Sequence, residues 1–137
     1  MSKTSKTKRK TVAIPASLVW FEIPADNVQR ARAFYGKLFG WKIKQFTGAM
    51  KGPYWHIDTG GHDKSPDGGM MPRQCPEQGI TNYINVASAN KAAEKVKKLG
   101  GKVLMEKTAV SGMGYFVVCQ DTEKNAFALW ERDEKAR

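Results

Sequence analysis

Cysteine, histidine and long apolar runs are all scarce in this chain of 137 residues. Two cysteines are too few for a disulfide-based scaffold, so a reduced, cytoplasmic setting is expected. No apolar run approaches the roughly 20 residues of a membrane-spanning helix, and the start of the chain lacks the apolar stretch of a secretion signal. We therefore expect a soluble protein with no membrane partner, in which only His56 and His62 can supply an imidazole.

Acidic residues are absent from the opening segment MSKTSKTKRKT, which carries five basic side chains. The whole chain has 23 Lys and Arg against 13 Asp and Glu, which gives a net charge of +10. The opening segment therefore contributes half of the net positive charge. No aromatic residue is interleaved with these cations to stack on nucleic-acid bases. We expect a disordered basic tail, with nucleic-acid binding limited to weak contacts of that tail.

Several chemistries lack their motifs. No strand–GxGxxG–helix unit is present, and the glycine pairs do not fit a phosphate-binding loop. Cys75 lies in a proline-flanked linker with no histidine at motif spacing, whereas Cys119 is expected to be buried in a strand. A nucleophilic triad is therefore not supported.

An internal repeat dominates the organisation of the chain. One constant shift of the sequence against itself aligns Ile23 with Ile84, Tyr54 with Tyr115, and Gly40 with Gly101. Each copy begins with an alternating strand and continues with an amphipathic helix that a left-handed glycine should end. Three short strands then follow, so the repeat unit is predicted to be βαβββ. The expected strands are 18–23, 41–46, 54–58 and 69–72 in the first copy, and 80–86, 102–107, 115–120 and 126–131 in the second.

This repeat divides the chain into successive segments. We expect a disordered tail at 1–16, a first βαβββ module at 17–73, a linker at 74–79, a second module at 80–132, and a short C-terminal tail at 133–137.

The stretches VWFEIPADNVQRARAFYGKLFGW, ITNYINVASANKAAEKVKKLGGKVL and GMGYFVVCQDTEKNAFALWE resemble the vicinal-oxygen-chelate (VOC) superfamily. That superfamily includes glyoxalase I (lactoylglutathione lyase), bleomycin-resistance proteins and extradiol dioxygenases, and the resemblance covers about residues 18–131. It implies an α+β fold in which two tandem βαβββ modules form a half-open curved barrel. It also implies a homodimer.

The resemblance also implies where metal-using members place their four ligands, on the first and last strands of each module. These positions fall on Trp20, Thr81, Ala128 and, within one or two residues, Met71. None of these side chains supplies the imidazole or carboxylate donor that a divalent ion needs. We therefore expect no metal cofactor.

A displaced metal site is the alternative. Residues two apart on a strand share a face, so Glu22, His56 and Asp58 could approach one another. The protein would then be a divalent-metal-dependent lyase or dioxygenase of the same superfamily with displaced ligands. A polar network inside the barrel explains the same three residues without a metal.

The same alternation predicts an apolar, aromatic cavity between the modules, although aromatic residues at this spacing also fill cores. The favoured function is binding of a small organic molecule there, with a metal-independent lyase or isomerase as a sub-case. Glu22 and His56 are the candidate catalytic residues, because either can move a proton. The candidate ligand-binding residues are Trp20, Met71, Thr81, Tyr83, Tyr115, Ala128 and Trp130.

Overall fold

The computed structural model describes residues 14–48 and 52–137, so most of the expected basic tail lies outside the described residues. The first module consists of β1 (Leu18–Ala25), α1 (Val28–Phe39), β2 (Lys42–Gln45), β3 (Trp55–Asp58), a short 3-10 helix η2 (His62–Lys64) and β4 (Gly68–Pro72). The second consists of β5 (Thr81–Asn85), α2 (Ala89–Lys98), β6 (Lys102–Val110), β7 (Gly114–Gln120) and β8 (Ala126–Arg132). None of the helices described is long and apolar enough to cross a membrane.

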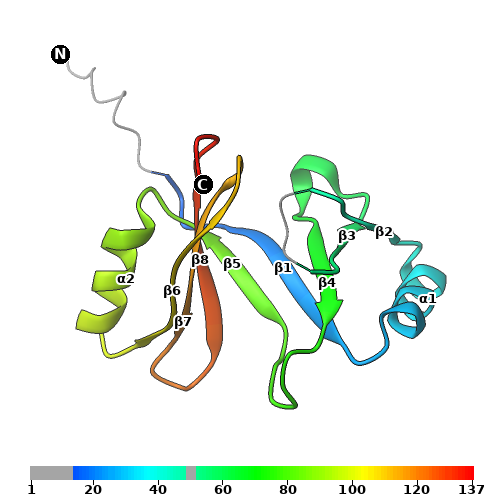
Figure 1. Ribbon diagram of the computed structural model, residues 1–137, viewed down its shortest axis with the longest axis horizontal. Helices are drawn as coiled ribbons and strands as arrows, with labels where there is room; N and C mark the ends of the chain where they lie inside the picture. The colour runs from blue at the N-terminus through cyan, green and yellow to red at the C-terminus, as the bar shows by residue number, and fades with distance from the viewer. Residues whose placement is uncertain (1–13, 49–51) are drawn as a thin grey trace.

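All eight strands belong to one mixed sheet, in the order β2-β3-β4-β1-β5-β8-β7-β6. The β1–β4 and β5–β8 pairs are parallel, and the other pairs are antiparallel. The two modules meet at the central β1–β5 pair, while the edge strands β2 and β6 lie at opposite ends of the strand order (Figure 1). The α+β fold of two tandem βαβββ modules is thus present, as one sheet whose ends are not paired.

Both helices begin at polar caps that the sequence supplies. The Asn27 side chain accepts a hydrogen bond from the Arg30 N–H at 2.9 Å, and the Ser88 hydroxyl accepts one from the Lys91 N–H at 3.2 Å. These bonds satisfy backbone donors that have no partner within the helix. α1 ends at Gly40, whose φ of 75° is the left-handed conformation that glycine adopts without strain.

The end of α2 differs from the expectation. The left-handed residue there is Gly100, with a φ of 97°, so the assignment of this conformation to Gly101 is wrong. Gly101 is required for another reason: a Cβ atom at this position would lie 2.6 Å from the Gln120 carbonyl oxygen. The two helices therefore end differently, and the repeat is not a uniform shift along the whole chain.

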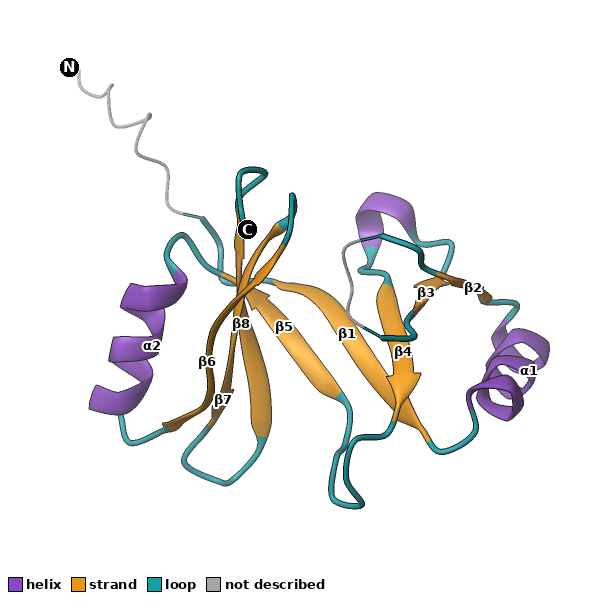
Figure 2. Ribbon diagram, in the orientation of Figure 1, coloured by secondary structure: helices purple, strands orange, loops and turns teal. Residues whose placement is uncertain are grey.

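Two separate hydrophobic cores lie between the sheet and its helices, which sit at opposite ends of the molecule (Figure 2). The largest fully buried side chains of the first core are Ile57 and Met70, and those of the second are Val117 and Cys119. Cys119 is buried as the sequence predicts. Because side chains alternate along a strand, the residues between these core positions face the other side of the sheet.

The strand ladders define which residues of the two modules correspond. In the central pair, Trp20 lies opposite Tyr83 and Glu22 opposite Thr81, which preserves the alignment that the sequence repeat predicts. On the next strands, Glu22 pairs with Gly69 and Tyr83 with Ala128, so Gly69 corresponds to Ala128. The repeat would instead align Gly69 with Trp130, which lies two positions further along β8. The predicted faces of this strand are kept, because residues two apart share a face.

In the third strand of each module, the repeat does not predict the correct face for the side chains. His56 pairs with Gly69 and Val118 pairs with Ala128, so His56 corresponds to Val118, whereas the repeat would align it with Val117. A slip of a single position reverses the face of every side chain on a strand. The expected inner position of Tyr115 is therefore wrong, since Tyr115 shares a face with the core residue Val117.

Candidate functional site

A cavity of about 270 Å³ lies between the two modules. Its walls come from the faces of β1, β3, β5, β7 and β8 opposite the helix-covered cores, together with neighbouring loops. Six of the lining side chains are aromatic: Trp20, Phe46, Tyr54, Tyr83, Phe116 and Trp130. The others are Val19, Glu22, His56, Val110 and Met113. Both modules contribute, so the cavity exists only where they are joined.

Among the described residues that line the cavity, Glu22 is the only acidic one. Its Oε2 accepts a hydrogen bond from the Tyr54 hydroxyl and its Oε1 accepts one from the Tyr83 hydroxyl, each at 2.7 Å. Tyr54 belongs to the first module and Tyr83 to the second. The two phenols hold the carboxylate in one orientation and join the modules through a polar contact.

The direction of these hydrogen bonds follows from Trp20. The indole Nε1–H donates to the Tyr54 hydroxyl oxygen at 3.0 Å, and an indole nitrogen can only donate. The Tyr54 oxygen is therefore an acceptor toward Trp20, and its own proton is directed to Glu22. Both oxygens of the Glu22 carboxylate thus accept a phenolic hydrogen bond, one from each module.

Burial raises the pKa of Tyr54 and of Tyr83 well above the ordinary value for tyrosine, and the nearby charge of Glu22 raises both further. Both phenols therefore stay protonated at physiological pH. They act as hydrogen-bond donors, and neither is a base. This leaves Glu22 and His56 as the groups lining the cavity that can accept a proton.

Gly69 provides the space that Tyr54 occupies. A Cβ atom at this position would overlap the Tyr54 hydroxyl, so even alanine would displace the phenol from Glu22. The adjacent Gly68 lies against Phe21 on the core side in the same way. The two glycines of β4 are thus needed for close packing on both faces of the sheet.

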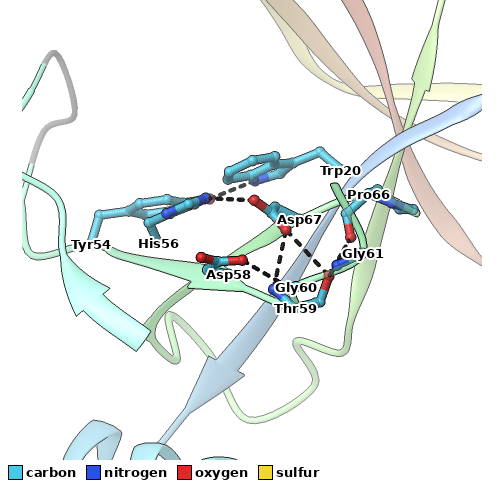
Figure 3. A network of polar contacts seen from close by, with 9 residues as sticks. All are labelled: Trp20, Tyr54, His56, Asp58, Thr59, Gly60, Gly61, Pro66 and Asp67. Carbon is cyan, nitrogen blue, oxygen red and sulfur yellow. Dashed lines mark hydrogen bonds and ion pairs between the residues drawn. The ribbon is translucent and has the colours of Figure 1, made fainter. Parts of the chain in front are cut away.

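His56 is held by a second polar network at the rim of the cavity (Figure 3). Its Nε2 lies 3.1 Å from Asp67 Oδ2, and Asp67 Oδ1 accepts hydrogen bonds from the backbone N–H and the hydroxyl of Thr59. The imidazole stacks on Trp20 with 5.7 Å between ring centroids. Because a carboxylate accepts the Nε2 proton, Nδ1 is the basic nitrogen of His56.

The residues proposed from the sequence divide into two groups. Those that line the cavity are Trp20, Glu22, His56, Tyr83 and Trp130. Those that do not line it are Met71, Thr81, Tyr115 and Ala128. Ala128 is fully buried where it pairs with Tyr83, and the Tyr115 ring lies beneath the Lys107 ammonium at 4.2 Å from the ring centroid.

Sequence reasoning missed several lining residues. Tyr54 shares a face with His56, so alternation along β3 provided a signal for it. Phe116 was missed because the repeat register placed Tyr115, and not Phe116, on the side of the sheet that faces the cavity. Alternation with Trp20 and Glu22 would place Val19 on the core face, but the β1–β5 register shifts between Leu18 and Trp20, and Val19 lines the cavity. The remaining missed residues, Phe46, Val110 and Met113, lie in or beside loops, where periodicity gives no signal.

The side chains do not fit the metal site that the resemblance implies. The Trp20 indole donates to Tyr54 and offers no lone pair, and Ala128 has no donor atom. The displaced set also fails to assemble, because Asp58 accepts from the Gly60 N–H at 2.9 Å while His56 pairs with Asp67. Within residues 14–48 and 52–137, no group of three or more His, Cys, Asp and Glu residues could hold a metal ion.

The buried phenols predict how stability depends on alkaline pH. An unfolded tyrosine ionises with a pKa of 10.0, whereas Tyr54 and Tyr83 stay protonated in the fold, so unfolding releases protons above that pH. The free energy of unfolding should fall as pH rises above this value, by up to about 1.4 kcal/mol per pH unit for each phenol. In urea denaturation at a series of pH values, Tyr83→Phe should make this fall shallower. Equal slopes for the two proteins would contradict the burial of this phenol.

Comparisons with known proteins bear on the fold and the family. Residues 17–50 match the family described as Bleomycin resistance protein-like N-terminal. The chain is 34% identical over 118 residues to a Glyoxylase-like domain-containing protein of Didymella fabae, a match that covers 83% of this chain and 92% of that protein.

Solved structures share the fold at low identity. Methylmalonyl-CoA epimerase from Mycobacterium tuberculosis superposes with a TM-score of 0.64 and 13% identity, covering 90% of this chain and 92% of that one. A glyoxalase/bleomycin resistance protein/dioxygenase superfamily member from Vibrio splendidus 12B01 gives a TM-score of 0.62 and 11% identity, covering 85% and 98%. With its two βαβββ modules and its similarity to the fungal relative, the chain belongs to the glyoxalase/bleomycin resistance/dioxygenase (VOC) superfamily as a glyoxylase-like member.

Proposed function

We propose that this glyoxylase-like protein binds a small organic molecule in the cavity between its modules, without a divalent metal ion. The observation that carries the proposal is the cavity itself, in which aromatic walls surround one carboxylate fixed by two phenols. Ligand sites generally combine an apolar wall with a few polar groups in fixed positions. The aromatic rings supply contact area, and Glu22 and His56 supply orientation.

The volume favours a compact ligand. At about 270 Å³ the cavity lies just below the usual range for small-molecule sites, which begins at about 300 Å³. Because Glu22 is anchored by Tyr54 and Tyr83, its carboxylate loses little conformational entropy when a ligand binds. The same anchoring makes Glu22 the best single position at which to test the proposal.

Binding should be detectable as thermal stabilisation, because a ligand that binds only the folded state raises the melting temperature. We expect a screen of small organic molecules to yield compounds that stabilise the wild type. Glu22→Gln and Trp20→Ala should weaken binding of those compounds by about tenfold or more, through loss of a charged hydrogen-bond acceptor and of stacking area.

Glu106→Gln is the matched control for this experiment, since it makes the same charge change at an exposed position on β6. It should leave binding unchanged. Binding that survives Glu22→Gln, in a variant that is itself strongly destabilised, would make Glu22 a structural residue and would contradict the proposal.

Metal independence has its own measurement. As-purified protein, assayed by elemental analysis, should contain far less than one Mn, Fe, Co, Ni or Zn ion per chain, because the side chains at the expected ligand positions offer no suitable donor set. Removal of metals by a chelator should leave ligand stabilisation intact. Stoichiometric metal that is lost on Glu22→Gln substitution would favour the alternative, a metal-dependent lyase or dioxygenase with displaced ligands.

A metal-independent lyase or isomerase is the second candidate function. It is favoured by His56, whose contact with Asp67 orients the imidazole beside the cavity, and by the Glu22 carboxylate that two phenols hold in place. A carboxylate and an imidazole at one site can remove a proton from a ligand and return it at another atom. Glu22 and His56 would then be catalytic residues.

Proton transfer can be measured without knowing the natural substrate. Screening compounds that bind and carry a C–H group next to a carbonyl should exchange that proton for deuterium in D₂O, followed by NMR. His56→Gln and Glu22→Gln should each slow the exchange by about a hundredfold. If a bound compound exchanges its proton only at the uncatalysed rate, the protein binds that compound without catalysing proton transfer. The catalytic candidate is then excluded.

The homodimer implied by the superfamily stays a prediction, which sedimentation velocity can measure. Phe34, Leu38 and Phe39 favour it, since these side chains of α1 are more than half exposed and form an apolar surface.

A further inference from the structure

We infer that the ligand of this cavity is an organic cation, such as a quaternary ammonium or a protonated amine. The inference rests on the proposed function, because it names the chemical class that the same cavity would bind. It follows from the charge of Glu22, from the use of the surrounding hydrogen-bond donors, and from the aromatic wall.

Glu22 is a negative charge without a counter-ion among the described residues. The ion pairs of residues 14–48 and 52–137 involve other carboxylates: Asp67, Asp26, Glu94 and Glu134. The described side chains that line the cavity include neither lysine nor arginine. A cationic ligand would supply the positive charge that this carboxylate lacks, and each Glu22 oxygen accepts a single hydrogen bond from the described residues, which leaves room for another.

The donors that contact Glu22, directly or through Tyr54, are already used. The Trp20 N–H donates to Tyr54, and the hydroxyls of Tyr54 and Tyr83 donate to Glu22. His56 Nε2 is directed to Asp67. An anionic ligand would therefore be repelled by the Glu22 carboxylate and could not use these donors. A cationic ligand would instead contact the carboxylate oxygens and the faces of the aromatic rings.

The aromatic wall favours the same ligand class. The π-system of an aromatic ring carries negative potential on its face, and cages of such rings bind quaternary ammonium groups. Six rings line this cavity around one carboxylate. A neutral ligand of the same shape would gain the contact area but neither of these electrostatic contributions.

The net charge of the chain acts in the opposite direction. At +10 the protein as a whole attracts anions, but charges more than about 10 Å apart are largely screened at physiological salt. Local contacts inside the cavity are screened much less. Preference for a cation in so basic a protein would therefore report on the cavity and not on the overall charge.

Three compounds of similar size and different charge separate these contributions. Choline is the cation, 3,3-dimethylbutan-1-ol is its neutral counterpart of the same shape, and 3,3-dimethylbutanoate is the anion. Binding is followed by NMR through the four tryptophan indole N–H signals. Trp20 and Trp130 line the cavity, while Trp41 and Trp55 pack in the core on the other face and serve as internal controls.

We expect choline to shift the Trp20 and Trp130 signals selectively, with an affinity at least about tenfold higher than that of the neutral alcohol and with no comparable effect of the anion. Glu22→Gln should remove most of this preference, and Trp130→Leu should weaken choline binding more than alcohol binding. Glu106→Gln should change neither. The indole spectrum of each variant also reports whether it is folded.

The outcomes separate the two proposals. If the alcohol or the carboxylate binds at the same tryptophans as tightly as choline, the cavity is a small-molecule site and the inference of a cation is wrong. If choline binds but Glu22→Gln and Glu106→Gln behave alike, Glu22 does not select the charge and the inference is again wrong. If no probe, and no compound of the wider screen, affects Trp20 or Trp130, the proposed function itself fails.

Discussion

The fixed position of one carboxylate in an aromatic cavity is the constraint on which the rest of the site depends. A polar group that is partly removed from water is costly unless hydrogen bonds satisfy it, and the Glu22 carboxylate meets this condition through the hydroxyls of Tyr54 and Tyr83. Each phenol then imposes its own requirement. Tyr54 needs the absence of a side chain at Gly69, and Tyr83 needs the β1–β5 pair that joins the modules. The polar network therefore specifies how the two halves meet, as well as what the cavity offers to a ligand.

The repeated βαβββ module does not make the site symmetric. Tyr54 corresponds to Phe116 through the ladders, so the position that supplies a hydroxyl in the first module supplies a plain ring in the second. His56 corresponds to Val118 in the same way. The first module thus carries most of the polar groups and the second most of the apolar wall, with Tyr83 as the exception. A ligand bound between them would meet one polar side and one apolar side, which fixes its orientation.

Much of the fold could be predicted from the sequence, because periodicity and caps are local signals. The positions of α1 and of Trp20, Glu22, Tyr83 and Trp130 follow from alternation and from the repeat. The face of β7 could not, since loop lengths differ between the modules and a slip of a single position reverses a strand. Contacts between distant segments, such as His56 with Asp67, have no local signal at all. The function is the least predictable part, because the superfamily fold specifies a cavity but not its chemistry.

We propose that the side chain at position 20 gives this cavity a chemistry different from that of metal-using members of the superfamily. A metal ligand must present a lone pair, whereas the Trp20 indole presents an N–H and directs it to Tyr54. That bond leaves the Tyr54 proton for Glu22, so a tryptophan at this position organises the carboxylate instead of a cation. The ring also stacks on His56 and thereby connects the two polar networks of the first module. In this proposal a hydrogen-bond donor stands where the resemblance places a lone-pair donor, and the cavity offers a ligand the fixed Glu22 carboxylate instead of a metal ion.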